Sequence, residues 1–571
     1  MPVHVLGFNA THDAAAVLLR DGVPVIAVEE ERLSRVKHHF GMPERAVAAC
    51  LAAGGIGIDG VDHVAFYMDA GLWLRSFGTW FLRGLPSSIA FVRRRPALWK
   101  SFLGIEGRFR RTFGYRGPFH MVEHHEAHAA SAFWPSGFDE AAVLTVDGAG
   151  ERVTTLMGEM RPGGLVRHRQ EVYPKSVGKA WEAVTDWLGF RPQSGEGKVM
   201  GLAAWGRPAL RERFREVLRP DGDGSFHLDL SFFDYPRGRS PLYGERFVRE
   251  FGPARCSDGP IEPRHEDVAF ALQAATEEVV LHMARRLRER TGLRRIVMAG
   301  GCALNAPANH RVATEAGFDE VFIQPAAGDN GASLGAALTV YHRVVQGGTR
   351  WTMADAFLGP AVDDAGAEAA VRGLGLPFER PRDLEAAAAD LLAAGKVIGW
   401  ARGRMEYGPR ALGHRSILAD PRPREMFDRV NRSVKRREPF RPLAPVVRLE
   451  DLPLFVERPV PSPFMLLTFP VRAEMRARIP AVVHADGSAR MQSVTHAQEP
   501  SLHRLLGLFG ARTGVPCLMN TSFNRRGEPV VATARDAAEA FLDMDLDALV
   551  LGNLLVTRPG GKRWTGPEAR P

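Results

Sequence analysis

Three strand-like segments in the first part of the chain each run into a glycine-containing turn. They are residues 141–146, 295–298 and 321–324, and the turns follow at 147–150, 299–301 and 325–331. Short apolar runs bounded by turn residues predict buried strands. Open α/β sheets bind their ligands where strands end in such turns. The chain is therefore expected to be an α/β protein with a site at these strand ends.

Further strand-like segments and a change in the sequence pattern near residue 360 indicate two parts. Residues 4–9 and 25–29 are strand-like, and Asp21-Gly22 is a hairpin signal before the second. From about residue 360 an expected linker leads into a helical pattern at 362–376, and no short repeat is present. The later strands are expected at 397–400, 445–447, 465–469, 515–519 and 548–552. We expect two unlike domains, 1–355 and 356–571.

Composition limits the cellular setting. No apolar run approaches the roughly 20 residues of a membrane span, and the N-terminus MPVHVLGFNA has no signal-peptide pattern, which favours a cytoplasmic protein. The four cysteines include no CxxC pair, so neither a disulfide framework nor a zinc ribbon is indicated. The net charge of +8 permits nucleic-acid binding without requiring it, and anionic small substrates explain the arginines equally well.

The stretch VEHHEAHAAS suggests part of a metal site. On a helix His124 and His128 lie one turn apart on the same face, while His125 points about 100° away. Two imidazoles alone are equally typical of an exposed polar helix. Asp147 and Asp329, at two of the turns, would complete a mixed nitrogen and oxygen site suited to iron, manganese or zinc. As alternatives, Asp147 is a turn residue and Asp329 a helix cap.

Two further groups of residues suggest anion binding. In AGGCALNA the amides of Gly300 and Gly301 could hold phosphate and Asn305 could donate to an oxygen, although many ordinary turns look like this. In the second part, EYGPRALGHRS, NRSVKRREPFRPLAP and NTSFNRRGEP gather residues suited to a nucleotide and a second phosphorylated substrate. They are Arg410, Arg415, Lys435, Arg441, Asn520, Ser522 and Asn524, and Arg490, between the second and third stretches, joins them. Arg436 and Arg437 are expected on a solvated helix end instead.

The ordered motifs HHEAH, TVDGAGE, GKVMGLAAWG, AGGCALNA, GDNGASLGAA, GPRALGHRS, FRPLAP and NTSFNRRGEP resemble those of the NodU/CmcH carbamoyltransferase family. Within it the chain looks most like antibiotic-tailoring O-carbamoyltransferases. The resemblance implies a TsaD-like N-terminal domain, with the actin-like duplicated RNase H fold, and a YrdC-like C-terminal α/β domain.

The resemblance also implies a two-stage reaction. The YrdC-like domain would form carbamoyl-adenylate from carbamoyl phosphate and Mg-ATP, and the TsaD-like domain would transfer the carbamoyl group to an acceptor hydroxyl. The family's metal ligands fall on the two histidines and two aspartates above, and its usual metal is iron(II). Lys198 and Asn305 would assist, and His12 matches the family's histidine after the first strand, a candidate general base. A lone histidine there is otherwise more often structural.

The chain departs from the family mainly at 68–117, a segment rich in Trp, Phe and Arg. Most of its aromatics are expected in the core, but Trp73, Phe77, Trp80 and Phe81 would suit a macrolide or other polyketide acceptor. Aminoglycoside or nodulation-factor acceptors, an actin-like-fold kinase and a non-catalytic ATP-binding regulator are the alternatives. No nucleic-acid partner is expected, and the sequence leaves the oligomeric state open, a homodimer included.

Overall fold

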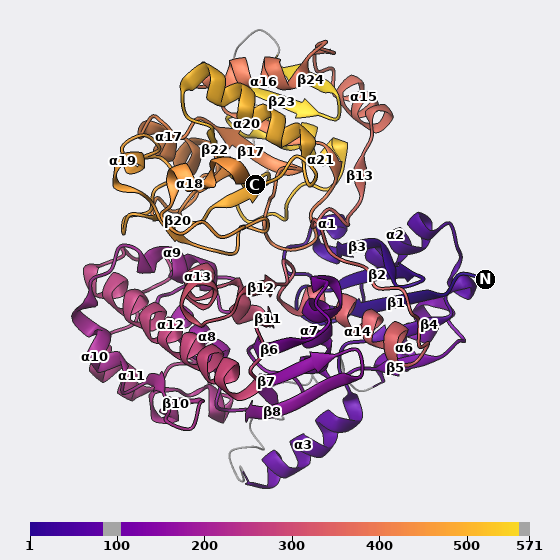
Figure 1. Cartoon of the computed structure of the whole chain (residues 1–571), viewed down its shortest axis with the longest axis vertical. Coiled ribbons are helices and arrows are strands. Elements are labelled where there is room, and N and C mark those ends of the chain that lie inside the picture. Colours follow the sequence, from indigo (N-terminus) through magenta and orange to yellow (C-terminus); the bar gives the residue numbers. More distant parts are fainter. Residues whose placement is uncertain (84–103, 559–571) are drawn as a thin grey trace. The chain divides into compact units, whose positions relative to one another are not determined.

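The computed structural model describes residues 1–83 and 104–558, and its contacts divide into two units. The first comprises Met1–Glu30 with His38–Met353, and the second Glu31–Lys37 with Ala354–Pro571. The division therefore falls near residue 355, and it assigns the short segment Glu31–Lys37 to the second unit as well. Figure 1 labels the helices and strands.

The first unit contains the same five-stranded sheet twice. Strands β1 (His4–Asn9), β2 (Ala15–Arg20) and β3 (Val23–Glu29) form an antiparallel meander, and β4 (His63–Phe66) and β5 (Phe119–Met121) extend it in parallel beside β1, in the order β3-β2-β1-β4-β5. The second sheet repeats this order as β8-β7-β6-β11-β12, with β6 (Ala141–Val146), β7 (Val153–Arg161), β8 (Gly164–Val172), β11 (Arg295–Ala299) and β12 (Glu320–Ile323). This repeat confirms the expected actin-like duplication of an RNase H fold.

The helix after each sheet packs against the other sheet's helix. Helix α7 (His124–Phe133) follows β5 and contacts β6 and β11, whereas α14 (Asp329–Arg343) follows β12 and packs on β1, β2 and β4. The two helices lie side by side (Figure 1). Their approach depends on small residues, because a Cβ on Gly335 would lie 1.7 Å from the carbonyl oxygen of Ala127. The crossing brings the N-termini of both helices to one place.

The remaining elements of this unit surround the two sheets. They are α2 (Glu44–Gly54), α3 (Ala70–Arg83), α6 (Ile105–Phe113), α8 (Val177–Trp187), α9 (Glu196–Ala203), α10 (Arg211–Phe214), β9 (Leu218–Pro220), β10 (Phe226–Leu228), α11 (Glu245–Phe251), α12 (Pro263–Thr291) and α13 (Ala306–Glu315). The segment predicted to shape an acceptor pocket is described only at its two ends. Residues 84–103, and the side chains of Phe77, Trp80 and Phe81, lie outside the described residues.

The second unit is built on one eight-stranded mixed sheet, in the order β14-β24-β23-β15-β17-β22-β18-β21. Its strands are β14 (Phe378–Glu379), β15 (Ile398–Ala401), β17 (Arg415–Ala419), β18 (Ala444–Arg448), β21 (Gln492–Val494), β22 (Cys517–Ser522), β23 (Ala548–Leu551) and β24 (Leu554–Thr557). Apolar side chains of α16 (Leu384–Ala393) and α20 (Pro500–Thr513) form a core with these strands. Outside the sheet lie α1 (Glu30–Ser34), β13 (Ala361–Val362), α15 (Asp364–Gly373), β16 (Gly403–Arg404), α17 (Glu425–Asp428), α18 (Leu452–Phe455), β19 (Phe469–Pro470), α19 (Ala473–Arg476), β20 (Ser488–Ala489) and α21 (Ala534–Asp543).

Most of the predicted strands are confirmed, but one is wrong. The segment 465–469 contributes only Phe469 to a strand, because Met465 takes a left-handed backbone conformation, with φ 56°, that a strand does not admit.

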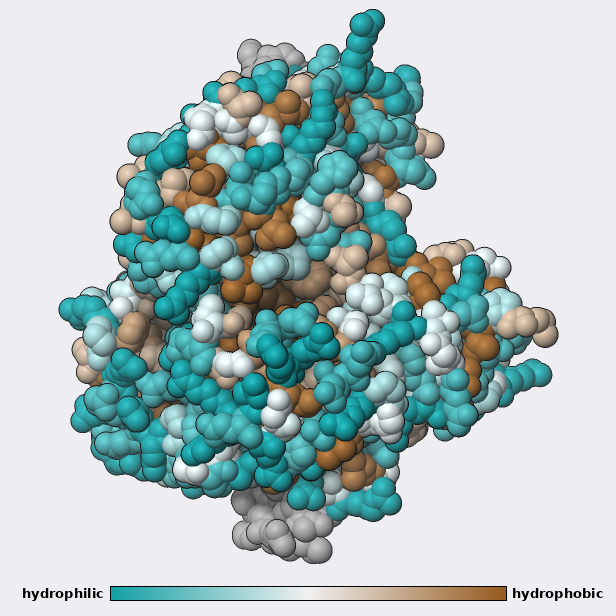
Figure 2. Space-filling model, viewed as in Figure 1, coloured by the Kyte–Doolittle hydropathy of each residue, from teal (hydrophilic) through white to brown (hydrophobic). Residues whose placement is uncertain are grey.

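No described helix is long and apolar enough to cross a membrane, and hydrophilic side chains predominate on the face in view (Figure 2).

Candidate metal centre and a buried cation cluster

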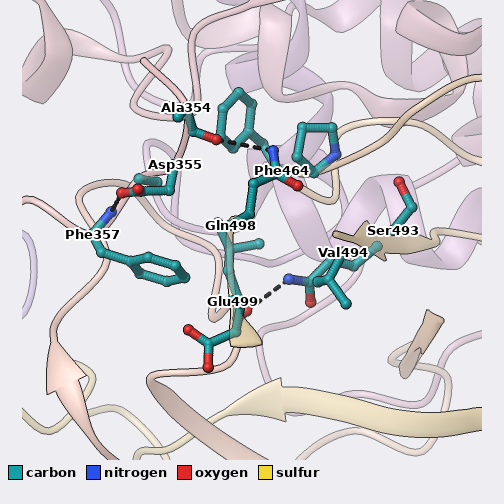
Figure 3. A pocket seen from close by; sticks show the side chains of 12 residues that line it. Ala354, Asp355, Phe357, Phe464, Ser493, Val494, Gln498 and Glu499 are labelled. Atoms are coloured by element: carbon teal, nitrogen blue, oxygen red, sulfur yellow. Dashed lines mark hydrogen bonds between the residues drawn. The ribbon is translucent and has the colours of Figure 1, made fainter. Parts of the chain in front are cut away.

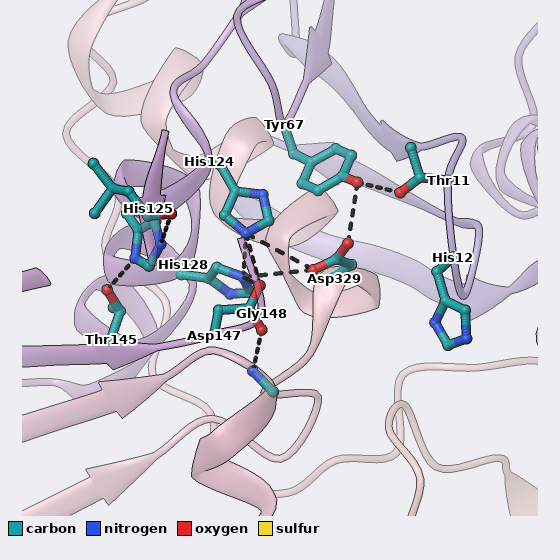
Figure 4. Close-up of polar contacts among 12 residues, drawn as sticks. Thr11, His12, Tyr67, His124, His125, His128, Thr145, Asp147, Gly148 and Asp329 are labelled. Atoms are coloured by element: carbon teal, nitrogen blue, oxygen red, sulfur yellow. Dashed lines mark hydrogen bonds and ion pairs between the residues drawn. The ribbon is translucent and has the colours of Figure 1, made fainter. Parts of the chain in front are cut away.

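Four side chains of the first unit converge at the crossing of α7 and α14. His124 is the first residue of α7 and His128 lies one turn further on, Asp147 follows β6, and Asp329 is the first residue of α14. One ligand atom from each of the four lies within 4.8 Å of the others (Figure 4). The predicted ligands, far apart in the sequence, therefore do come together as a candidate metal centre.

The geometry at this centre suits a cation. The Nε2 atoms of His124 and His128 are 3.1 Å apart, and Asp147 Oδ2 lies 3.1 Å from His124 Nε2. Asp329 Oδ1 lies 3.7 Å from His128 Nε2. Burial lowers the pKa of His124, but the carboxylates of Asp147, Asp329 and Glu151 outweigh it and raise that pKa to about 9. Two nitrogen and two oxygen donors in such a field fit a divalent transition metal.

Other side chains hold the ligands in place. The N–H of Gly301 donates to Asp147 Oδ1 at 2.7 Å. The Tyr67 hydroxyl lies 3.2 Å from Asp329 Oδ2 and also contacts the hydroxyl of Thr11, in the loop after β1 (Figure 4). Tyr67 follows β4 directly, and no periodic pattern in the sequence marks it. Such outer contacts orient ligands and tune metal affinity.

The predicted phosphate-binding residues of AGGCALNA have other contacts in the structure. Gly300 has φ 88°, and a Cβ there would lie 2.4 Å from the Val146 carbonyl oxygen, so this turn requires glycine. Gly301 supports Asp147, as described. The side-chain oxygen of Asn305 accepts the Ala308 N–H at the start of α13, its amide also pairs with Gln273, and its assisting role stays a prediction. Lys198 lies with its Nζ 5.2 Å from the Phe190 ring centre, and its assisting role stays a prediction.

His125, the middle histidine of the HHEAH motif, is structural. Its ring lies 2.6 Å from the Thr145 hydroxyl through Nδ1 and 2.9 Å from the Val153 carbonyl oxygen through Nε2. Burial, with the neighbouring His124, lowers its pKa to about 3. The neutral ring donates to the carbonyl and accepts from the hydroxyl, tying α7 to two strands.

His12 lies in the loop after β1 and remains partly open, with 30% of its side chain exposed. Its Nδ1 is 3.0 Å from Asp13 Oδ2. Burial lowers its pKa, but Asp13, Asp329 and Glu182 raise it more, so the pKa lies above 6.5. Its role as a base stays a prediction. Asp13 is not among the residues predicted from the sequence, although it directly follows His12 in NATHDAAA.

The second unit contains a cluster of buried cations. Its members are Arg410, Lys435, Arg437, Arg441 and Arg490, which we call the cation cluster. Burial lowers the pKa of every member, and that of Arg410 falls to about 10. Repulsion between members lowers the pKa further for all except Arg441, where Glu438 opposes the effect of burial. The Nε of Arg490 is buried with no hydrogen-bond partner in the described part of the chain. Five buried cations gathered beside one carboxylate, that of Glu438, favour an anionic ligand.

Two predictions about this region need correction. Arg415 is fully buried and does not line the cluster, because its guanidinium donates to the backbone carbonyls of residues 360, 402, 403, 414 and 532. Arg437 is not on a solvated helix end: it donates to Asn431 and lies in the cluster. Arg436 is exposed, as expected.

The end of β22 and the two residues after it, 520–524, surround the Lys435 ammonium. The Lys435 ammonium donates to the Ser522 carbonyl, the Asn524 carbonyl and the Asn524 side chain, at 2.6, 2.9 and 2.6 Å. The Ser522 hydroxyl also bonds Asn524, and the Asn520 amide donates to Gln492 while its Oδ1 is buried without a partner among the described residues. Lys435 thus adds charge to the cluster while fixing this loop.

Glu406, which is not among the residues predicted from the sequence, organises the loop that carries Arg410. Its Oε1 accepts the backbone N–H groups of Leu412, His414 and Arg415 at 2.7, 2.9 and 3.2 Å. The carboxylate is buried, so removing it would leave three amides unsatisfied. The motif EYGPRALGHRS therefore wraps around its own first residue.

A separate pocket of the second unit has a different character. Its lining includes Asp355, Phe357, Phe464 and Glu499 (Figure 3), and Glu499 pairs with His414, whose ring stacks on Phe357. None of the predicted anion-binding side chains lines it. With two carboxylates and two aromatic rings, it does not suit a phosphate.

Comparison with known proteins defines the class. A family model described as Carbamoyltransferase N-terminus matches residues 4–338, and one described as Carbamoyltransferase C-terminus matches residues 389–558. Both describe enzymes that transfer a carbamoyl group. The chain belongs to this carbamoyltransferase family, and the resemblance to NodU/CmcH proteins is confirmed.

Individual relatives agree with this membership. The nodulation protein NolNO of Sinorhizobium fredii is 37% identical, over 98% of this chain and 80% of the relative. The 3'-hydroxymethylcephem-O-carbamoyltransferase of Streptomyces clavuligerus is 33% identical, over 64% of this chain and 65% of the relative. Among solved structures, HypF of T. kodakarensis is 12% identical with a TM-score of 0.32, covering 61% of this chain and 49% of that one. So distant a likeness supports no conclusion about this chain.

Proposed function

We propose that this protein is an ATP-dependent O-carbamoyltransferase that makes carbamoyl-adenylate and transfers its carbamoyl group to a hydroxyl of a small natural product. Membership of the carbamoyltransferase family supports the group transferred. The cation cluster of the second unit is the observation that supports anionic donors, carbamoyl phosphate and Mg-ATP.

The first stage joins the two donors. Water cleaves carbamoyl phosphate to carbamate and phosphate, and a carbamate oxygen then attacks the α-phosphorus of ATP and expels pyrophosphate. Arg410, Arg441 and Arg490 bind the phosphate oxygens, since a guanidinium can donate two parallel hydrogen bonds to an anion. Lys435 fixes the segment that carries Ser522 and Asn524 beside these phosphate groups.

The second stage takes place in the first unit. The acceptor oxygen attacks the carbamoyl carbon, the bond from that carbon to the phosphate oxygen breaks, AMP leaves, and the hydroxyl proton passes to His12 Nε2. His124, His128, Asp147 and Asp329 would hold iron(II) or another divalent metal, which when bound offsets negative charge on the leaving phosphate. Lys198 assists in binding that phosphate.

The acceptor is a hydroxylated small molecule, with a macrolide or other polyketide as the proposed class. Support comes from the aromatic character of the segment 68–117, in which Trp73 is half-buried on α3. The S. clavuligerus relative, named for a hydroxymethylcephem, and the nodulation relative support other antibiotics, aminoglycosides included, or nodulation factors as the alternative acceptors.

The test is a reaction of purified enzyme with ATP, carbamoyl phosphate and a panel of macrolides, aminoglycosides and oligosaccharides, read by mass spectrometry. The proposal predicts a product in which one carbamoyl group replaces a hydroxyl hydrogen, formed only with both donors present. Pyrophosphate release at the same rate with and without carbamoyl phosphate would contradict it.

A further inference from the structure

Side chains at and around the loop after β1 form a hydrogen-bonded chain, of which the reaction above uses only His12. Asp13 Oδ2 faces His12 Nδ1 at 3.0 Å, and Asp13 Oδ1 faces His38 Nδ1 at 2.8 Å. The other ring nitrogen of His38, Nε2, lies 2.9 Å from the Ser194 hydroxyl. The rings of His12 and His38 stack, with centroids 4.9 Å apart. One carboxylate thus bridges two imidazoles.

Three residues in or next to this chain of side chains have strained backbone conformations. Asp13, His38 and Gln193, the residue before Ser194, have φ values of 56°, 54° and 63°. Such conformations are unfavourable for non-glycine residues and cluster at functional sites. All three belong to the first unit. The strain therefore concentrates where His12, Asp13, His38 and Ser194 meet.

Local hydrogen bonds hold the strained loop in shape. The Asn9 amide donates to the carbonyls of His12 and Asp13 at 2.9 and 3.1 Å, and its Oδ1 accepts the Thr11 N–H. The Ala14 N–H donates to the His39 carbonyl at 3.1 Å, which ties the two loops together. The conformation is thus fixed from both sides.

We propose that Asp13 is a positioning residue for His12: it accepts the Nδ1–H, so that Nε2 carries the lone pair, while His38 and Ser194 brace its other oxygen. The assignment of the acceptor proton to Nε2 rests on the proposed function. No hydrogen bond within the described residues ends on His12 Nε2, and the side chain is partly exposed. The nitrogen that the reaction needs is the one that the cluster leaves available.

A metal ion is the competing explanation, since His12, Asp13 and His38 also form a group of closely spaced potential ligands. The distances argue against it. Each Nδ1 lies at hydrogen-bond distance from a different oxygen of the same carboxylate, an arrangement that two N–H donors satisfy without an ion. An ion would instead draw one oxygen and both nitrogens to a common point.

The charges around His12 support the same role for Asp13. Burial raises the pKa of Asp13, but the donated bonds and charges of His12 and His38 lower it far more, so Asp13 stays ionised. Facing His12, Asp329 and Glu182 add negative charge. A carboxylate at Nδ1 both selects the tautomer and stabilises the imidazolium that forms when Nε2 takes a proton, as in the Ser-His-Asp arrangement.

The test is an NMR titration of the full-length protein with 15N-labelled histidine, with the His12 signals assigned by their loss in His12→Gln. Wild-type His12 is expected in the Nδ1–H form, with a pKa above 6.5. Asp13→Gly deletes the carboxylate without straining the left-handed backbone, and it should abolish the tautomer preference and lower the pKa. Asp59→Asn, an exposed carboxylate of the same unit, should change neither.

Activity supplies the second readout. Asp13→Gly should lower carbamoyl transfer by about 10²- to 10⁴-fold while carbamoyl-phosphate-dependent pyrophosphate release continues. His38→Gln should lower transfer by a smaller factor, and transfer at the wild-type rate would overturn the bracing role. A wild-type Nε2–H tautomer, or a tautomer and pKa unchanged in Asp13→Gly, overturns the proposal. If wild-type enzyme shows the Nδ1–H form but carbamoylates nothing, the proposed function fails and the pairing stands.

Discussion

His124 and Asp329 occupy equivalent positions in the two halves of the duplicated sheet, each as the first residue of the helix that follows its last strand. The duplication therefore delivers a nitrogen and an oxygen ligand to one point from two halves of the chain. His128 and Asp147 complete the set from α7 and from the end of β6.

Removing one ligand should empty this centre. We expect His124→Ala and Asp329→Asn to reduce bound divalent metal in elemental analysis to about a tenth or less, because a four-ligand site loses a donor and its geometry. His120→Gln, which removes a half-buried histidine outside the group, is the matched control. Metal content unchanged by both substitutions would remove these residues from the site.

The cation cluster predicts opposite effects on activity and stability. Arg490→Gln should lower pyrophosphate release about 10- to 100-fold, the loss of one charged hydrogen bond. In phosphate-free buffer its free energy of unfolding should equal or exceed that of the wild type, because a buried charge facing Arg410, Arg437 and Arg441 is gone. Denaturant titration and a pyrophosphate assay measure the two quantities, with Arg436→Gln as the exposed control. A large loss of stability would show that the charge of Arg490 is compensated within the folded protein.

Arg415 should behave in the reverse manner. Arg415→Met leaves several buried backbone carbonyls without a donor, so we expect it to lower the free energy of unfolding by about 3 kcal/mol. Arg436→Met should stay within about 0.5 kcal/mol. If Arg415→Met is as stable as the wild type yet fails to release pyrophosphate, Arg415 binds substrate after all.

The pairing of Asp13 with His12 predicts a pH-dependent stability. Because the folded-state pKa of His12 is raised, its charged pairing stabilises the fold fully below about 6.5 and is lost as pH rises through the folded-state pKa. Asp13→Asn should therefore destabilise the protein more at pH 6 than at pH 9, measured by denaturant midpoints. Equal destabilisation at the two pH values would mean that His12 carries no extra charge in the folded protein.

The sequence predicts those parts of the protein that depend on local pattern. Apolar runs ending in turn residues located β6, β11 and β12, and the spacing of His124 and His128 identified one face of α7. The convergence of Asp147 and Asp329 required strand order, which family motifs implied and periodicity alone did not. The failed strand at 465–469 is apolar like a strand, but its first residue is left-handed.

Side-chain direction was the other limit. Arg410 and Arg415 belong to one motif, yet Arg410 lies in the cation cluster and Arg415 donates to backbone carbonyl oxygens. No local pattern separates the two. Likewise, His38 lies far from Asp13 along the chain, and the bond between them arises from two strained loops. Such contacts depend on tertiary structure.

The central claim is that adenylate formation and carbamoyl transfer use different residues, and His12→Gln tests it most directly. With ATP, carbamoyl phosphate and an acceptor that the wild type carbamoylates, pyrophosphate release and product mass are measured in the same reaction. The account predicts pyrophosphate release near the wild-type rate with product formation lowered about 10²- to 10⁴-fold. Product formed at the wild-type rate, or pyrophosphate release lost together with transfer, would contradict it.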